Sequence, residues 1–190
     1  MKQWIVVLTI LMTLAGTANA VINFSEFPVG TVISNQYAGQ GVLFSAGNVT
    51  PRLPVISMDG AMPSEPVLRP TGEPDFGSYQ GDFWMQFTAP VVTSVTFDSG
   101  YWDSLGSGII NVYDPGMGLL ASLSNANTGV FTFAISGLGP IGYVYFNSIA
   151  DPAGGDIDNL AFNAIPAPGA LLLGALGAGL VGWMRRRRAM

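Results

Sequence analysis

Between residues 21 and 164, apolar side chains recur at every second position in short runs, with polar residues between them. A period of two is typical of β-strands with one buried face, whereas helices repeat every 3.6 residues. Gly, Pro, Asn and Asp separate the runs. We predict about eight strands or more, packed as an all-β antiparallel β-sandwich, a jelly roll. The apolar positions are Ile22 and Phe24; Val42 and Phe44; Phe83, Met85 and Phe87; Val95 and Phe97; Ile110 and Val112; Phe131, Phe133 and Ile135; Val144 and Phe146; Leu160 and Phe162.

The segment 47–81 breaks this pattern because it is rich in proline, which cannot donate a hydrogen bond to a sheet. Loops of this length in compact domains are usually functional or disordered. We interpret the segment as a long excursion from the sandwich. Within it, residues 55–58 and 67–68 are apolar enough to form short edge strands.

The N-terminal end has the three parts of a secretory signal peptide. Lys2 precedes an apolar run over residues 4–15, and Ala18-Asn19-Ala20 supplies the small residues that signal peptidase requires. Residues 1–20 are therefore predicted to be removed, so that the mature protein begins at Val21. The alternative is an uncleaved N-terminal anchor.

The C-terminal end, residues 165–190, has the pattern of a membrane anchor. Residues 169–184 carry no charge, and from Ile165 the apolar stretch is long enough for about 30 Å of helix, which spans a bilayer. We predict a transmembrane helix over 168–184. The arginines that follow it resist translocation and place this end in the cytoplasm, with the sandwich outside. A buried core helix is the alternative.

Charge and composition exclude several classes of function. All 12 acidic residues lie between residues 21 and 168, where only Arg52 and Arg69 oppose them. Such an acidic domain repels phosphates, so nucleic acid is excluded as a partner. The chain has no histidine and no cysteine, which excludes disulfides, histidine-based triads, thiol nucleophiles and ordinary zinc sites.

The order of motifs in the tail resembles the PEP-CTERM sorting signal of exported proteins in Gram-negative bacteria. Pro166-Ala167-Pro168 precedes the apolar stretch, and an arginine cluster closes it. The resemblance implies recognition and processing by an exosortase, in bacteria that make extracellular polysaccharide. Ala167 departs from the signature, which carries glutamate at this position. The cluster consists of Arg185, Arg186, Arg187 and Arg188.

The sandwich resembles carbohydrate-binding jelly rolls at both of its ends. The similar stretches are residues 24–31, 36–37 and 41–44 at its start and residues 156–162 at its close. In such modules an acidic residue near the first strand and an aspartate at the start of the last strand commonly share a structural calcium ion. The resemblance thus implies a Ca²⁺ site formed by Glu26 and Asp158, with Asp156 as a further candidate. The alternative is that the aspartates of residues 151–158 only shape turns.

Two places have the residue types that bind sugars, since sugar rings stack on exposed aromatic rings beside acids and amides. Tyr101 and Trp102 lie between Asp98 and Asp103, and Trp84 alternates with the apolar face of its strand. Glycan binding by Trp84, Tyr101 and Trp102 is one interpretation. The other is that these rings pack against the core and the long loop.

Catalysis would have to use paired carboxylates across a cleft, as in glycoside hydrolysis. Four acids in or beside the proline-rich segment are candidates, although acids in such loops are usually only solvated: Glu65, Glu73, Asp75 and Asp82. The overall prediction is a non-catalytic protein, exported across the inner membrane and anchored there, then placed on the cell surface. It would be a structural or adhesive component of the envelope or biofilm, with calcium and an extracellular polysaccharide as expected ligands. A secreted glycan-active enzyme is the alternative.

Overall fold

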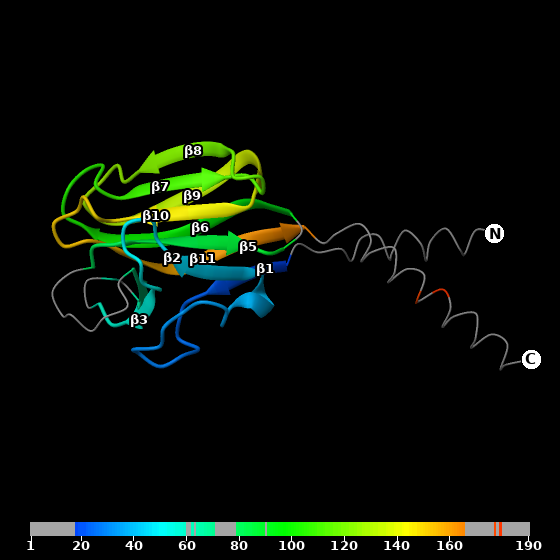
Figure 1. Cartoon of the computed structure of the whole chain (residues 1–190), viewed down its shortest axis with the longest axis horizontal. Helices are drawn as coiled ribbons and strands as arrows, with labels where there is room; N and C mark the ends of the chain where they lie inside the picture. Colours follow the sequence, from blue (N-terminus) through cyan, green and yellow to red (C-terminus); the bar gives the residue numbers. More distant parts are fainter. Residues whose placement is uncertain are drawn as a thin grey trace, which may run out of the picture.

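The computed structural model describes residues 18–59, 62, 64–70, 79–89, 91–165, 177 and 179. Strands dominate these residues, and Figure 1 shows them running along the long axis of the domain in two layers. The strands are β1 (Ala18–Ile22), β2 (Val42–Ala46), β3 (Val55–Ser57), β4 (Val67–Arg69), β5 (Asp82–Phe87), β6 (Val91–Trp102), β7 (Ile109–Tyr113), β8 (Leu119–Ser124), β9 (Gly129–Ile141), β10 (Tyr143–Asn147) and β11 (Asp156–Ile165), with a short 3-10 helix η1 (Ala38–Gln40) before β2.

The strands form two antiparallel sheets, which confirms the prediction of an all-β sandwich. The six-stranded sheet A has the order β3-β4-β11-β6-β9, and β1 also pairs with β11. The five-stranded sheet B has the order β2-β5-β10-β7-β8. Because neighbours in each sheet come from distant parts of the sequence, the two ends of the domain meet at β1 and β11.

The predicted alternation decides which side chains fill the space between the sheets. In β5, for example, Phe83, Met85 and Phe87 are buried, whereas Trp84 and Gln86 face the other side. We did not predict β8. None of its residues is buried, so its sequence shows no clear alternation of apolar and polar positions. Phe24, predicted to continue the first strand, is buried but lies beyond β1 with a φ of 58°, in the left-handed region.

The proline-rich segment contributes two short strands to the edge of sheet A, as predicted from its apolar residues. β3 pairs with β4, and Leu68 of β4 pairs with Ile157 of β11. This pairing places the described parts of the segment beside β11, and β3 lies at the lower edge of the domain in Figure 1.

The targeting predictions fall mostly outside the described residues. β1 begins at Ala18, so cleavage after Ala20 would leave only Val21 and Ile22 of this strand. Residues 1–17, the motif 166–168 and the arginines 185–188 lie outside the description. Within the part of the chain that the structure describes, no helix is both long and apolar enough to cross a membrane.

Candidate functional site

The outer face of sheet B carries a contiguous group of aromatic side chains. Trp84 of β5 lies directly opposite Tyr145 of β10, and Tyr143 of β10 lies opposite Tyr113 of β7. The ring centroids of Trp84 and Tyr145 are 4.7 Å apart, and those of Trp84 and Tyr113 are 5.4 Å apart. We call these residues the aromatic face: Trp84, Tyr113, Tyr143 and Tyr145.

Trp84 is the centre of the aromatic face and is held in a fixed orientation. Its ring contacts both Tyr113 and Tyr145, and its indole N–H donates a hydrogen bond of 3.2 Å to Oδ1 of Asn48. The ring is half-buried, so part of it remains accessible. A tryptophan ring fixed in this way loses little conformational entropy when a sugar stacks on it. The prediction that Trp84 faces outward is confirmed.

Uncharged polar side chains surround the aromatic face. Gln86 donates a hydrogen bond to the hydroxyl of Tyr143, and Asn111 lies opposite Tyr145. In the next register positions, Ser45 lies opposite Trp84 and Ser122 opposite Asn111. Amides and hydroxyls of this kind match the hydroxyl groups of a sugar.

A single buried carboxylate supports the aromatic face from one end of β5. Asp82 accepts hydrogen bonds from the hydroxyl of Tyr145 (2.5 Å), from the backbone N–H of Val49 (2.8 Å) and from that of Thr50 (2.6 Å). These bonds hold the loop that carries Asn48 against the sheet. A Cβ at Gly47 would lie 2.1 Å from the Asp82 carboxyl carbon, so only glycine fits there.

The hydrogen-bond donors around Asp82 determine the direction in which its pKa is shifted. Burial raises the pKa of Asp82, but the bonds from Tyr145, Val49 and Thr50 outweigh burial, so the pKa lies below its ordinary value. Burial and the neighbouring Asp82 raise the pKa of Tyr145, whose hydroxyl therefore stays a donor. Asp82 is thus a structural anion and not an exposed acid for catalysis.

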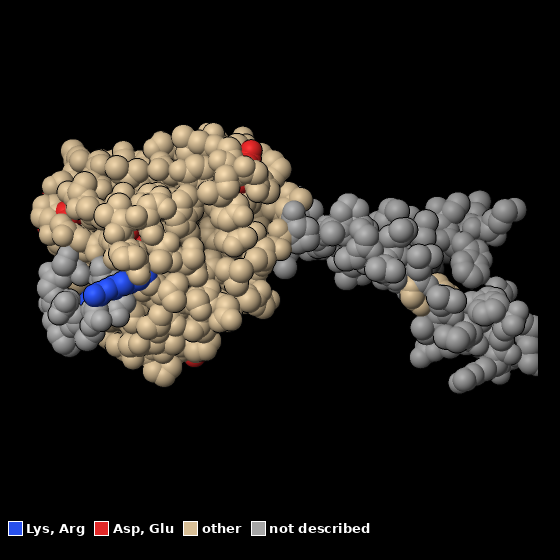
Figure 2. Space-filling view, viewed as in Figure 1, with Lys and Arg blue, Asp and Glu red and all other residues tan. Residues whose placement is uncertain are grey.

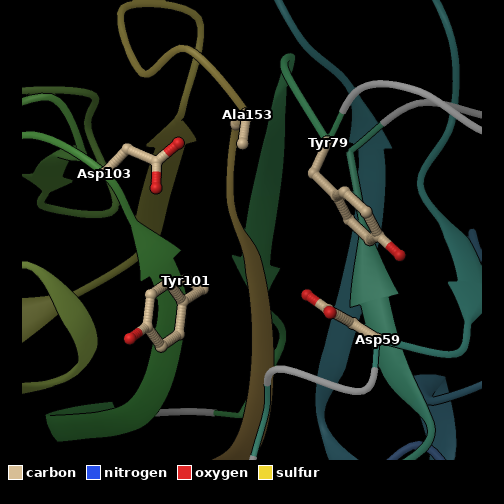
Figure 3. A pocket seen from close by; sticks show the side chains of 6 residues that line it. Asp59, Tyr79, Tyr101, Asp103 and Ala153 are labelled. Atoms are coloured by element: carbon tan, nitrogen blue, oxygen red, sulfur yellow. The ribbon is translucent and has the colours of Figure 1, made fainter.

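A pocket of about 220 Å³ lies at the end of sheet A, away from the aromatic face. Figure 3 shows Asp59 and Tyr79 on one side of it and Tyr101 and Asp103 on the other. Asp59 follows β3, Tyr101 belongs to β6, and Asp103 comes directly after β6. Tyr101 is 50% exposed, so the prediction that it lies at the surface is confirmed. The full lining consists of Asp59, Tyr79, Tyr101, Asp103, Ala153 and Gly154.

The glycan-binding interpretation is wrong for Trp102. Its side chain belongs to the core, as the other interpretation held. Its side chain is 0% exposed and packs against Phe146 at a centroid distance of 6.0 Å. A Cβ at Gly108 or Gly155 would approach the indole to 2.4 Å or 2.7 Å, so both glycines make room for the ring. A register shift between β6 and β9 lies between Ser99 and Trp102, and the simple alternation of the sequence does not hold across it.

The three predicted calcium ligands lie in different surroundings. Glu26 is exposed and accepts a hydrogen bond of 3.0 Å from Tyr37, whereas Asp156 and Asp158 are fully buried on β11. Asp158 accepts a bond from Ser64. Among the described residues, no group of three or more acidic side chains is arranged to hold a metal ion. Calcium binding by Glu26 with Asp158 therefore stays a prediction.

Several other acids have structural roles or lie outside the description. Asp151 is buried and accepts bonds from Ser107 and from the backbone N–H groups of residues 103, 104, 153 and 154, so it shapes turns as the alternative interpretation held. Glu65 is exposed in the proline-rich segment. Glu73 and Asp75 fall outside the described residues.

Sequence reasoning missed most of the aromatic face, although the signal for it was present. Val144 and Phe146 were assigned to the core, which by alternation places Tyr143 and Tyr145 outside. The same reasoning from Val112 places Tyr113 outside. What the sequence does not contain is the order β5-β10-β7, which brings the three strands side by side.

No protein-family model and no curated protein matches this sequence. Among solved structures, a variant of a family 29 carbohydrate-binding module is similar to this chain, with 16% identity over 78% of this chain and 92% of that chain, at a TM-score of 0.41. A variant of the module CBM29-2 complexed with mannohexaose shares 14% identity over 78% and 92% of the two chains, at a TM-score of 0.39. Likenesses with TM-scores below 0.5 carry no weight for the function of this chain.

Proposed function

We propose that this protein binds a polysaccharide on the aromatic face of sheet B, without catalysing a reaction on it. The observation that carries the proposal is the contact of two partly exposed rings, Trp84 and Tyr113, on the outer face of sheet B, while the buried Tyr145 packs against Trp84 from the strand between them. Partly exposed aromatic rings such as Trp84, Tyr113 and Tyr143 can stack on sugar rings, and the neighbouring amides can accept hydrogen bonds from the sugar hydroxyls and donate to them.

The charges of the molecule favour a neutral polysaccharide over an acidic one. The acid that supports the aromatic face, Asp82, is buried and already bonded to three donors. Asp82, Asp151, Asp156 and Asp158 are buried, but the acids that remain still outnumber Arg52 and Arg69, so an acidic polysaccharide would be repelled. In the view of Figure 2, acidic atoms appear only at scattered points, and one stretch of Lys or Arg atoms is visible on an otherwise uncharged surface.

The experiment is affinity electrophoresis of the full chain through gels that contain one polysaccharide each. A β-glucan, a mannan, a xylan and a polyuronate test the ligand class. We expect retardation in at least one neutral gel and its loss in Trp84→Ala. The matched control is Tyr101→Ala, which removes the other exposed aromatic candidate. Absence of retardation in every gel, or equal retardation of wild type and Trp84→Ala, would contradict the proposal.

The same protein would act outside the cell membrane as a jelly-roll component of the envelope or biofilm. This part of the proposal is supported by the signal-like residues 1–20 and by the PEP-CTERM-like tail, with its apolar stretch and arginine cluster. The tail would anchor the chain in the inner membrane until an exosortase-like enzyme processes it. Because Ala167 replaces the glutamate of the signature, processing is the step to test.

Intact mass of the protein from membrane, surface and medium fractions of the native host tests the targeting. We expect a species that begins at Val21 and lacks the residues after the 166–168 motif. A membrane fraction with the tail intact and no processed species elsewhere would instead establish a simple single-span anchor.

A further inference from the structure

The edge of sheet B at β8 is open. β8 is the last strand of this sheet, and Figure 1 shows it along the border of the domain, on the side away from β3. Its backbone pairs with β7. Among the described residues, no other segment forms a backbone hydrogen bond with β8. Such an edge presents free N–H and C=O groups, which are a template for pairing with a further strand.

The edges at the other end of each sheet are covered by the chain itself. The N–H group of Phe44 in β2 donates a hydrogen bond of 2.7 Å to the carbonyl oxygen of Ser34. In β3, the N–H group of Ile56 donates a bond of 2.9 Å to the carbonyl oxygen of Thr31. The segment 30–34 therefore protects these two edges, whereas β8 has no such cover in the described part of the chain.

The sequence of β8 lacks the features that usually protect an edge strand. Charged side chains and proline block pairing at exposed edges, and the six residues of β8 include neither. The register shift against β7 lies at the Tyr113 end and leaves residues 121–124 in regular pairing. β9, at the edge of sheet A, is interrupted by Pro140 and by Gly137 and Gly139 in the left-handed region. Of these two edges, β8 is the better suited to accept a strand.

The chain around β8 is also uncharged. No acidic or basic residue occurs from residue 115 to residue 150, a range that covers β8, β9 and β10. The rest of the domain is acidic, so two copies repel each other on most approaches but not along this edge. Leu119, which is 60% exposed, adds an apolar side chain at one end of β8. The charge distribution therefore favours a second copy of this chain as the partner.

We propose that two copies of this chain pair through β8, with the strands antiparallel about a twofold axis perpendicular to sheet B. An antiparallel strand is complementary to itself about such an axis, so the same six residues form both halves of the contact. The two five-stranded sheets then become one continuous sheet. A single strand edge buries less than the about 1,200 Å² of total area that stable interfaces have, so the pair should form at micromolar or higher concentrations.

The twofold axis determines how the two domains are arranged. Rotation about an axis perpendicular to the sheet keeps both outer faces on the same side, so the two aromatic faces would lie in one surface. Binding of one polysaccharide by both copies rests on the proposed function, whereas the pairing itself does not. The rotation also sends the C-terminal ends of β11 to opposite ends of the pair. Pairing therefore suits released copies, or copies on facing surfaces.

The first test uses the absence of cysteine from the chain. Each of residues 119–124 is replaced singly by Cys, and the full chain is oxidised in mild detergent and analysed on non-reducing gels. Opposed residues of antiparallel strands have Cα atoms about 4.5–5.5 Å apart, within the range that a disulfide spans. We expect the yield of linked dimer to peak at the position nearest the axis and to fall on both sides. The matched control is Val29→Cys, which is exposed outside the strands and should stay monomeric.

Sedimentation velocity between low and high micromolar concentrations is the second test. The wild type should shift from monomer to dimer as its concentration rises. Ser122→Lys, which places two positive charges near the axis, should stay monomeric, and Val29→Lys should dimerise like the wild type. A dimer retained in Ser122→Lys would place the contact elsewhere, such as in the tail, and would overturn the proposal. A wild type that is monomeric at every concentration, or a β8 series that links no more than Val29→Cys, would overturn it as well.

Discussion

The outer faces of the two sheets each bury an aspartate, but they give it opposite surroundings. On sheet B, Asp82 accepts three hydrogen bonds and anchors the loop beside Trp84. On sheet A, Asp156 has no donor and faces Asp59. Burial removes water from both carboxylates, which costs free energy. Whether the ionised form is stabilised on balance depends on the hydrogen-bond donors that replace this water. Asp82 is therefore held as an anion with a lowered pKa, whereas burial and the neighbouring Asp59 raise the pKa of Asp156.

The largest expected effect is the loss of stability in Asp82→Asn. Both carboxylate oxygens of Asp82 accept bonds, so the amide group of asparagine must face at least one donor in either orientation. We expect the free energy of unfolding to fall by about 2–4 kcal/mol, measured by urea denaturation. Asp114→Asn, in the turn between β7 and β8, keeps an Oδ1 acceptor for the N–H groups of Gly116 and Gly118, so it should change the free energy of unfolding by less than about 0.5 kcal/mol. Equal effects of the two variants would contradict the anchoring role.

A second prediction concerns the ligand of the aromatic face. Trp84→Ala should weaken binding of the neutral polysaccharide about tenfold or more, which corresponds to about 1.4 kcal/mol of binding free energy. Calorimetry with the polysaccharide that retards the wild type measures this change. A circular dichroism spectrum like that of the wild type would show that the loss comes from the ligand contact.

Asp156→Asn should change the free energy of unfolding in the opposite direction to Asp82→Asn. Removing a buried charge that lacks a donor should raise the free energy of unfolding by about 1 kcal/mol. Urea denaturation of both variants in the same buffer makes the comparison direct. A destabilised Asp156→Asn would show that the protein stabilises this carboxyl group.

The pH dependence of the free energy of unfolding should also show that Asp82 is ionised in the folded protein. Its pKa is lowered in the folded state, so its contribution is complete above its ordinary pKa and is lost as the pH falls through the lowered value. The difference in stability between wild type and Asp82→Asn should therefore shrink below about pH 4. Denaturation at pH 7 and pH 3 measures it. A difference that is the same at both pH values would be inconsistent with an ionised Asp82.

Tyr101→Ala should have the smallest effect of the series. Its ring is 50% exposed at the pocket on sheet A, so we expect less than about 0.5 kcal/mol on stability and no change in polysaccharide affinity. Affinity electrophoresis checks this. A loss of retardation in Tyr101→Ala with full retardation in Trp84→Ala would move the glycan site to the other sheet.

The alternation of apolar residues was enough to predict the sandwich, because one buried face is a local property of each strand. It placed Phe83, Met85 and Phe87 inside and Trp84 outside. It did not cover Trp102, which we assigned to a loop between two acids, whereas the structure buries it at the end of β6 beyond a register shift. β8 was missed because none of its residues is fully buried.

The sequence by itself determined the all-β class, the edge strands of the proline-rich segment and the outward direction of Trp84, since each depends on nearby residues. Only the tertiary structure decided which side chains meet. Tyr145 reaches Trp84 because β10 lies between β5 and β7, and Asp59 reaches Asp156 because β3 and β4 extend sheet A beside β11. Contacts between residues so far apart in the chain depend on strand order, and strand order is set by the packing of the whole sandwich.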